Sequence, residues 1–536
     1  MKTESIVARY QQLMNGRRDA IHPELARSVP VNWDDAPLRQ TVRPGLASVP
    51  LAADFDPDLW LRSPAVLDAA RLAQVLLAAH GILRRKLDPN WDRSAAETAT
   101  KSPLYARGTS SGGGLYPTEL YVVASDMAGL PDGVYHYSEA HSALVRIRMG
   151  HFKSTVVEGL FSAPPRVESF LVLTLRFWKN AFKYHSFGYQ LMLQDVGACA
   201  ATIVTACSEL GLKARTFHEF DDTKVGALLG VNEDEEAPAL VVGLSSAKNK
   251  TEPFNSIDIG PRTNVTELKA PSLERSTTVS IPQLILDLHQ ATKQSAPASE
   301  ALSHSRIDSR VASVDTHSPA LESSLPSILR TRESCWGRFR TYPAMQLDPM
   351  IKALQFASAG GVLEPRHSET NVVRACILAL RVDNLSPAAY EYSGTSGKLT
   401  KISDWAGTSE SLQTLYWMPN YNLSQVAAVV AIAGATKAAF ATWGDRSIRT
   451  INIAAGALAQ RLYIGCSALS LGCGVVFGFN AAMAATLFHL PAEGEHPLLL
   501  AFIGPRSQSA AAYDFRVSGA ISTDSVKNGF GQSSRS

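Results

Sequence analysis

The stretch Arg107-Gly-Thr-Ser-Ser-Gly-Gly-Gly-Leu-Tyr-Pro-Thr-Glu-Leu-Tyr121 decides how this chain is interpreted. It places two hydroxyls and three consecutive glycines before an apolar run, residues 120–124, that is typical of a strand. Consecutive glycines adopt backbone conformations closed to other residues and let a flat or anionic ligand approach the main chain. The serines add hydroxyl donors, and the arginine adds a planar cation suited to a phosphate or an electron-rich ring. The predicted ligand-binding residues here are Arg107, Ser110, Ser111, Gly112 and Gly113.

Two common nucleotide motifs do not describe this loop. The sequence pattern indicates no strand before the glycines, as a dinucleotide fingerprint requires, and no Gly-Lys-Ser/Thr follows them, as a P-loop requires. A glycine run by itself is also compatible with a simple tight turn. The motif behind the glycines therefore has to carry the interpretation.

Composition bounds the class of protein. At 536 residues the chain exceeds one hydrophobic core, and its 45% apolar and 19% charged residues are those of an ordinary globular protein. A net charge of +2 gives no case for nucleic acid or a membrane surface as partner. The first ten residues have no secretory apolar core, and no uninterrupted apolar run reaches about 18 residues. The six cysteines form no CxxC pair, so we expect buried thiols in a reducing cytoplasm.

The sequence contains two similar units in tandem. The segment 135–137, Tyr-His-Tyr, matches 390–392, Tyr-Glu-Tyr, at an offset of 255 (392 − 137). Four further pairs share an offset of 259, as in 456 − 197. They are Gly197 and Gly456, Ser208 and Ser467, Phe220 and Phe479, and Pro238 and Pro497. A constant offset over some 40 residues, the span of these pairs, indicates a diverged tandem duplication.

This duplication predicts the domain organisation. We expect a lead-in at 1–50, a first domain at 51–270, a linker at 271–325, a second domain at 326–520 and a flexible tail at 521–536. The linker is rich in Ser, Thr, His and Pro, with one short helix predicted near 281–289. Each half is expected to be α+β, with helices covering a sheet and the long helices docking the halves together.

Each half is expected to contain two helices and four strands. In the first half we expect helices at 67–83 and 190–210, and strands at 119–124, 134–137, 169–175 and 239–244. In the second half we expect helices at 349–359 and 451–469, and strands at 374–380, 389–392, 425–433 and 498–503.

The segment Leu-Tyr-Pro-x-Glu-Leu-Tyr at 115–121 resembles the flavin-binding segment of the nitroreductase-like peptide azoline oxidases of the SagB/McbC type. Enzymes of this type are dimers with flavin mononucleotide (FMN) in the interface. The resemblance covers nearly the whole chain and implies two fused nitroreductase-like domains that form a pseudo-dimer within one chain. Family sites join an Arg-x-Ser and a C-terminal basic residue of one subunit to the Ser/Gly loop of the other.

The two halves divide these elements between them. The Ser/Gly loop is in the first half, because the corresponding 365–370 of the second half has no glycine. The first half offers only Arg62 and Lys248 toward a phosphate. The second half supplies the remaining residues that the resemblance implies for FMN, with Gly478 near the flavin N5: Arg332, Ser334, Gln460, Gly478 and Arg506. We therefore predict one FMN per chain.

Lys183 and Tyr184 resemble the Lys-Tyr pair that azoline oxidases place beside the flavin. Oxidation of an azoline removes a hydride and a proton, so a base is needed, and either residue could serve as the catalytic base. A surface lysine beside a packed tyrosine is the alternative. Family members usually carry arginines and a glutamate just downstream, where this chain has Phe187, Gly188, Gln194 and Asp195, which leaves the substrate open.

The expected function is FMN-dependent oxidation of a thiazoline or oxazoline to a thiazole or oxazole in a peptide natural product, with oxygen reoxidising the flavin. The peptide substrate is expected to be ribosomal or carrier-protein-tethered, with a cyclodehydratase or synthetase as a partner enzyme. No metal spacing is found among the histidines, so we predict no metal. Two alternatives stay open: an NAD(P)H-dependent nitroreductase or quinone reductase, and a peptide-binding scaffold without flavin.

Overall fold

The computed structural model describes most of the chain. The described residues are 5–16, 24–25, 30–61, 63–87, 104–162, 167–247, 263–268, 270–295, 323–335, 338–359, 372–394, 396–416, 418–491, 494–507 and 513–516. Arg62, Lys248, the segment 365–370 and the tail 521–536, all of which the sequence analysis singled out, lie outside them.

The first half is built on a seven-stranded antiparallel sheet with the order β1-β6-β5-β4-β7-β9-β8. Its strands are β1 (Ser48–Pro50), β4 (Thr118–Ala124), β5 (Gly133–Ser138), β6 (Ala143–Met149), β7 (Ser169–Arg176), β8 (Leu212–Phe217) and β9 (Glu236–Ser246). The central strands β4 and β7 are buried along their whole length, because helices cover both faces of the sheet.

The second half repeats this sheet without a counterpart of β1. Its order is β12-β11-β10-β13-β15-β14. The strands are β10 (Val373–Ala379), β11 (Ala388–Tyr392), β12 (Leu399–Asp404), β13 (Ala428–Gly434), β14 (Leu471–Val476) and β15 (His496–Pro505). Strand for strand, the order matches β6-β5-β4-β7-β9-β8, which confirms the predicted duplication and the α+β class.

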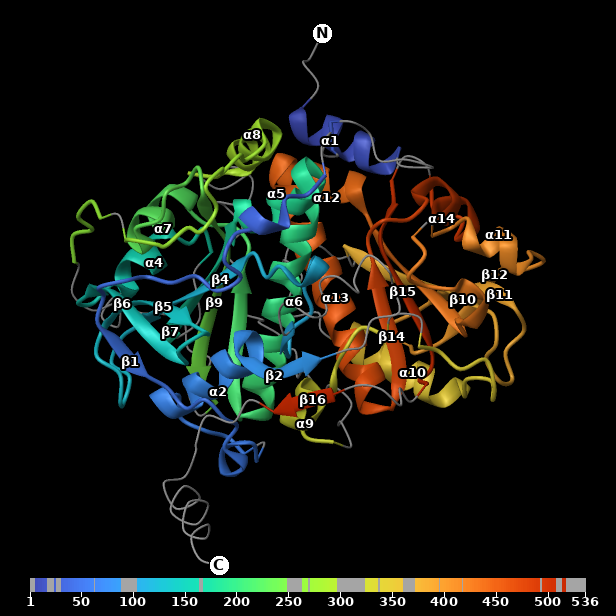
Figure 1. Cartoon of the computed structure of the whole chain (residues 1–536), viewed down its shortest axis with the longest axis horizontal. Helices are drawn as coiled ribbons and strands as arrows, with labels where there is room; N and C mark the ends of the chain where they lie inside the picture. The colour runs from blue at the N-terminus through green and yellow to red at the C-terminus, as the bar shows by residue number, and fades with distance from the viewer. Residues whose placement is uncertain are drawn as a thin grey trace, which may run out of the picture.

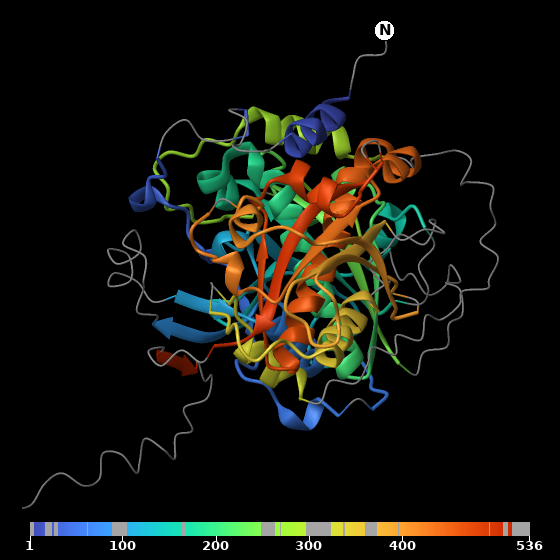
Figure 2. The ribbon, with the colours of Figure 1, turned by 90° about the vertical axis from the view of Figure 1, so that its right-hand side faces the viewer.

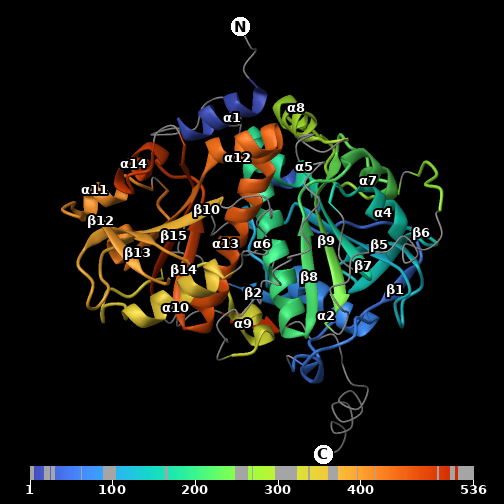
Figure 3. The same cartoon turned by 180° about the vertical axis from the view of Figure 1, so that it is seen from behind.

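Two long helices, α6 and α13, run side by side between the two sheets (Figures 1 and 3). The helices are α1 (Ile6–Asn15), α2 (Ala69–His80), α4 (Lys153–Gly159), α5 (Phe177–Tyr184), α6 (Gly188–Glu209), α7 (Asp222–Leu229), α8 (Gln283–Thr292), α9 (Leu325–Thr331), α10 (Leu347–Ser358), α11 (Ser409–Gln413), α12 (Thr436–Trp443), α13 (Ser447–Ala468) and α14 (Ala481–Leu487). The predicted docking of the halves through their long helices is confirmed.

Glycines set the distance between these two helices. A Cβ on Gly197 would lie 1.9 Å from the carbonyl oxygen of Ile453, and one on Gly456 would lie 1.9 Å from that of Gln194. Gly197 and Gly456 are duplicates at the 259 offset, and so are Gln194 and Ile453 (453 − 194). Each helix therefore makes the same contact with the other, as in an isologous dimer interface.

The stretch Phe177–Glu209 is long and apolar enough to cross a membrane by length and composition alone. In the structure, 89% of its most apolar window is buried inside the protein. This apolarity is explained by its position at the centre of the molecule, between the two halves.

A third, smaller sheet joins the end of the chain to the first half. It contains β2 (Ile82–Leu87), β3 (Leu104–Arg107) and β16 (Tyr513–Arg516), in the order β16-β2-β3 (Figure 2). The expectation that no strand precedes the glycines was wrong, because β3 ends at Arg107, five residues before Gly112. This four-residue strand is specified by its pairing with β2, and no local apolar pattern marks it.

The linker and the lead-in both pack against the body of the protein. The predicted linker helix is present as α8, and its Ile285 and Leu288 are fully buried. In the lead-in, β1 pairs with β6, and Tyr10 of α1 donates a hydrogen bond to the carbonyl of Ser186 (3.0 Å). These segments therefore help to build the molecule around the junction of the halves.

Candidate active site

The glycine loop is held from its own half by Asp195 on α6. The carboxylate accepts the N–H of Gly112 (2.9 Å) and the hydroxyl of Ser111. Ser111 Oγ in turn accepts the N–H of Tyr116 (2.9 Å). One buried side chain thus fixes the conformation of the loop between β3 and β4.

The same loop is held from the second half by Gln460 on α13. Its Oε1 accepts the N–H of Ser110 (3.0 Å), while its Nε2 donates to the carbonyl of Gly108 (3.2 Å) and to Thr202 Oγ1 (3.1 Å). Both ends of the Gln460 amide are therefore occupied by protein atoms. This position gives no support to the predicted direct contact between Gln460 and a cofactor, and it makes the residue a support of the loop.

Asp195 is a site residue that the sequence analysis mentioned only as a departure from the family pattern. Burial raises the pKa of its carboxyl to about 7, although the hydrogen bonds from Ser111 and Gly112 act in the opposite direction. The sequence feature that could have identified Asp195 is its position as an acidic residue inside a helix that is apolar on all sides. A buried carboxyl with so perturbed a pKa is a candidate for a functional role.

Lys183 and Tyr184 lie directly against the glycine loop. Gly113 has φ = +63°, a conformation that favours glycine, and a Cβ on it would lie 2.5 Å from Tyr184 Oη and 3.1 Å from Lys183 Nζ. Lys183 Nζ also lies 4.8 Å from the centre of the Tyr184 ring. The structure therefore brings the predicted catalytic pair and the predicted loop together.

The glycine-rich segment of the second half reaches the same place. The rings of Phe187 and Phe477 lie 4.5 Å apart, which puts the end of α5 beside the residues that follow β14. Gly478 comes next in the chain and is half-buried. Its predicted place near the reactive part of a flavin is compatible with this position and stays a prediction.

Arg332 has the strongest signature of an anion site in the described chain. It is buried, and neither its Nε nor its Nη1 has a hydrogen-bond partner among the described residues. Its Nη2 makes a long bond to the carbonyl of Arg107 (3.4 Å), and its guanidinium lies 5.2 Å from the centre of the Tyr463 ring. Burial lowers the pKa of Arg332, so an anion here would relieve both the charge and the vacant donors.

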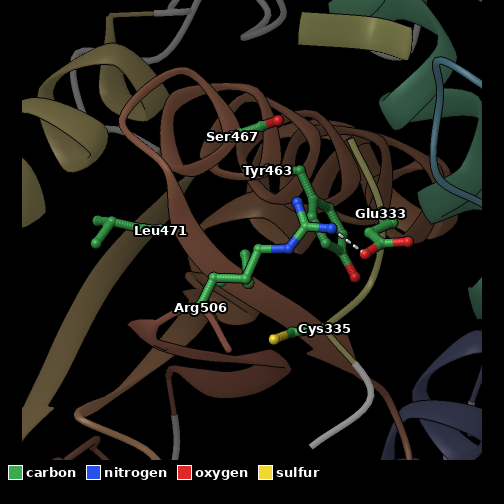
Figure 4. Close-up of a pocket in the computed structure, with 8 residues that line it drawn as sticks. Glu333, Cys335, Tyr463, Ser467, Leu471 and Arg506 are labelled. Atoms are coloured by element: carbon green, nitrogen blue, oxygen red, sulfur yellow. Dashed lines mark hydrogen bonds and ion pairs between the residues drawn. The ribbon is translucent and has the colours of Figure 1, made fainter. Parts of the chain in front are cut away.

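Ser334 and Arg506 lie near Arg332 on the second half. Ser334 Oγ is 2.8 Å from Tyr463 Oη. The guanidinium of Arg506 pairs with the carboxylate of Glu333, and 42% of the Arg506 side chain is exposed (Figure 4). These residues line or border a small pocket formed by Glu333, Cys335, Tyr463, Ser467, Leu471, Gly472, Cys473 and Arg506. The predicted cation is present, but a carboxylate that the sequence analysis did not consider engages it.

Arg107 is engaged by side chains of its own half. Its Nη2 donates to Glu139 (2.8 Å), its Nη1 contacts His80, and its guanidinium lies 4.1 Å from the centre of the Tyr116 ring. Only 2% of the residue is exposed. Its charge is therefore neutralised within the first half, and this position gives no support to a contact with a cofactor.

The junction related to this site by the internal symmetry is filled by a buried ion cluster. The duplicates of Phe187 and Phe477 at the 259 offset are Arg446 and His218, and Arg446 donates to the carbonyl of His218 (3.0 Å). Arg446 and Arg449 also pair with Asp222 of the first half. Arg446 donates as well to the carbonyl of the last residue of α8, at position 292 (3.0 Å).

The electrostatics of this cluster are those of a structural site. Burial alone would raise the pKa of Asp222, but Arg449 and Arg446 outweigh it and lower that pKa to about 2. Burial and Arg449 hold the pKa of His289, on α8, well below its ordinary value. The cluster therefore ties α7, α8 and α13 together at the junction that internal symmetry relates to the candidate site.

One group of potential metal ligands is close together within the described part of the chain, formed by Asp126, Asp132 and His151. Asp126 and His151 are exposed, and Asp132 already accepts the N–H of Asp126 (2.9 Å). No ion is present, and the expectation of no metal stays a prediction.

Comparisons with known proteins agree with this architecture. The chain is 34% identical over 132 residues to the trifolitoxin-processing protein TfxB of Rhizobium leguminosarum bv. trifolii, which is 22% of this chain and 35% of that protein. It is 27% identical over 138 residues to the microcin B17-processing protein McbC of Escherichia coli, which is 24% of this chain and 51% of that protein. The chain thus spans about a third and about half of the lengths of these curated relatives.

A crystal structure of a candidate nitroreductase from Anabaena variabilis has the same fold over nearly the whole chain. Its TM-score is 0.71 at 20% identity, and the match covers 94% of this chain and 100% of the other. The family model described as the nitroreductase family matches residues 63–244 and 330–504, more than half of the chain. With two such units docked as a pseudo-dimer, this chain belongs to the nitroreductase family.

Proposed function

We propose that this chain is an FMN-dependent dehydrogenase that oxidises a thiazoline or oxazoline to the aromatic azole in a peptide, with one FMN at the junction of the halves. The observation that carries the proposal is the position of Lys183 and Tyr184. Both lie against Gly113, in a loop that the two halves hold together, at a junction that also contains a buried arginine with donors left vacant by the described residues.

The residues at the junction fit the cofactor. Arg332 and Ser334 would hold the phosphate, because guanidinium donors that no described residue engages and a hydroxyl suit a dianion. The glycine loop, including Ser110 and Ser111, would hold the ring system, with Gly478 on its other side. When bound, FMN supplies the acceptor for the hydride that leaves the azoline. Filling of the related junction by Arg446 and α8 supports a single cofactor per chain.

The protein's own part in the reaction is to take a proton. Conversion of an azoline to an azole removes one hydride and one proton from the ring, and the two electrons are finally passed to oxygen, giving hydrogen peroxide. We assign the ring proton to Lys183 or Tyr184, and the contact distance of each from the loop supports this assignment. Such general-base catalysis contributes typically 10²- to 10⁴-fold to a rate.

The named relatives support a peptide as substrate. TfxB and McbC are both described as processing proteins, for trifolitoxin and for microcin B17. We propose a cyclodehydratase or a synthetase as the source of the azoline, formed either on a ribosomal peptide or on a peptide bound to a carrier protein. We also propose a cytoplasmic location.

The test uses the full chain loaded with FMN and a synthetic thiazoline peptide. Lys183→Met is expected to lower oxidation, measured by mass as the loss of two hydrogens, by roughly 10²- to 10⁴-fold while FMN stays bound. Thr442→Met, at the duplicate position on α12, is the matched control and is expected to leave the rate unchanged.

Other outcomes would replace the proposal. Protein that takes up no FMN would favour a peptide-binding scaffold. Flavin that is bleached by NAD(P)H faster than by any azoline peptide would favour a nitroreductase or quinone reductase.

A further inference from the structure

We infer that Trp33 forms an aromatic subsite for the substrate, and that this subsite receives the planar side chain of the residue next to the azoline in the peptide. The inference rests on the proposed function, because it names the feature of the peptide that the same site selects. Trp33 lies in the lead-in, outside the residues that match the nitroreductase family.

Trp33 lies beside the proposed base and is open to solvent. Lys183 Nζ is 5.6 Å from the centre of its ring, and the ring meets that of Phe182 edge-on at 5.3 Å and 78°. The residue is 47% exposed. A tryptophan that is half in solvent contributes only part of its area to the core, so stability alone does not explain its place.

The turn that presents Trp33 is fixed by the linker. Asp35 accepts the N–H and the hydroxyl of Thr277 (2.6 and 2.9 Å) and the N–H of Thr278 (3.0 Å). The carbonyl of Ala36 accepts a hydrogen bond from Arg275 Nε (2.9 Å). Trp33 is therefore held in advance in one position, which reduces the entropy lost when a ligand stacks on it.

The spacing indicates which part of the peptide lies there. Lys183 Nζ is 3.1 Å from where a Cβ at Gly113 would lie and 5.6 Å from the Trp33 ring centre, so the amine is close to both the glycine loop and the tryptophan. An azoline with its acidic hydrogen at Lys183 has its neighbouring residue one Cα step, about 3.8 Å, away. A planar side chain on that residue comes within the 4.5–7 Å at which aromatic rings interact.

The experiment compares two synthetic thiazoline peptides that differ only in the residue next to the ring, phenylalanine in one and alanine in the other. For the FMN-loaded wild-type chain, we expect KM to be about three- to tenfold lower for the phenylalanine peptide, with similar kcat. Trp33→Ala is expected to abolish this preference, and Trp33→Phe to restore most of it. Tyr342→Ala removes a more exposed aromatic side chain (85%) and serves as the control, which is expected to keep the preference.

The outcomes separate this inference from the proposed function. If wild-type protein oxidises neither peptide, the proposed function fails first, and the inference fails with it. If it oxidises both and Trp33→Ala keeps the wild-type preference, the subsite is wrong and the function stands. If Trp33→Ala lowers kcat equally for both peptides, Trp33 only orients Lys183, and the subsite is again wrong. Bound FMN, read from its absorbance, is expected to be the same in all variants.

Discussion

At one junction between the halves the rings of Phe187 and Phe477 lie 4.5 Å apart, beside the glycine loop. At the symmetry-related junction the duplicate positions are Arg446 and His218, held in a buried ion cluster with α8. The backbone frame is the same at both, since α6 and α13 begin and end at the 259 offset. Different side chains, together with the linker helix α8, thus turn one junction into a candidate site and the other into a structural joint.

A second pair of duplicate positions shows the same divergence. In the first half Glu119 is fully buried and contacts His136 (2.8 Å) and Lys179, which hold its pKa well below the ordinary value against the effect of burial. At the 255 offset the second half has Arg374 and Glu391, paired at 2.9 Å and partly exposed. In the first half Thr41 of the lead-in also donates a hydrogen bond to Glu119 (2.6 Å), which helps to satisfy this buried carboxylate.

Removal of Arg332 is expected to have the largest effect on the functional junction. Arg332→Ala removes two buried donors that have no partner in the described part of the chain. Each bond to a charged group is worth about 1.5–3 kcal/mol, so FMN affinity should fall roughly 10²- to 10⁴-fold. Quenching of flavin fluorescence measures it. Arg340→Ala, at an exposed position nearby, is the control. Equal FMN affinities for the two variants would show that the phosphate site lies elsewhere.

The structural junction is broken by Asp222→Ala, which leaves Arg446 and Arg449 buried without their carboxylate. We expect the free energy of unfolding in urea to fall by about 3–5 kcal/mol. Asp234→Ala removes an exposed carboxylate of the same half and is expected to change it by less than about 0.5 kcal/mol. A similar change in the free energy of unfolding for both variants would contradict a stabilising role for the cluster.

Asp195 gives the functional junction a pH dependence. Its pKa is about 7 in the folded chain and 3.8 in an unperturbed one, so the folded state keeps a proton that the unfolded state releases. The contribution of Asp195 to the free energy of unfolding should therefore fall as pH rises from 3.8 to about 7 and level off above. The Asp195→Asn variant should lack this fall, whose size in the wild-type chain is at most about 4 kcal/mol. Parallel pH profiles from urea titrations would show that the carboxyl is not buried as described.

The smallest expected effect sharpens the geometry of the loop. Gly113 and Gly114 both have positive φ (+63° and +66°), so alanine strains the backbone equally at either position. Only at Gly113 would the new methyl meet Tyr184 Oη, whereas nothing lies within 4 Å at Gly114. Gly113→Ala should therefore lower azoline oxidation roughly ten- to a hundredfold below Gly114→Ala. Equal rates would place Tyr184 away from the reaction.

Much of the fold could be predicted from the sequence because its central elements are apolar throughout. The predicted helices 190–210 and 451–469 correspond to α6 and α13, and the strand 169–175 to β7. The missed strands lie mainly at sheet edges, such as β8, most of whose residues are partly buried or exposed, and β14, two of whose six residues are glycine. Edge strands carry a weak apolar pattern, because one side of their ladder has no neighbour.

The site was predictable only as far as local motifs reach. The loop and the Lys183–Tyr184 pair could be identified from their residues and their resemblance to a family, and the structure brings them together. The roles of Arg107 and Gln460 could not, because their partners lie 32 and 350 residues away. The role of Glu333 could not be predicted for the same reason. It follows Arg332 directly, but its contact is with Arg506, far away in the sequence.

The reciprocal crossing of Gly197 and Gly456 occurs within a single polypeptide, and this has a consequence for how the protein behaves at low concentration. Two separate subunits come apart on dilution and lose any pocket that they share. Tethered halves face each other at an effective concentration set by the connecting segment, whatever the amount of protein in solution. The junction, with whatever it binds, therefore stays assembled in each individual molecule.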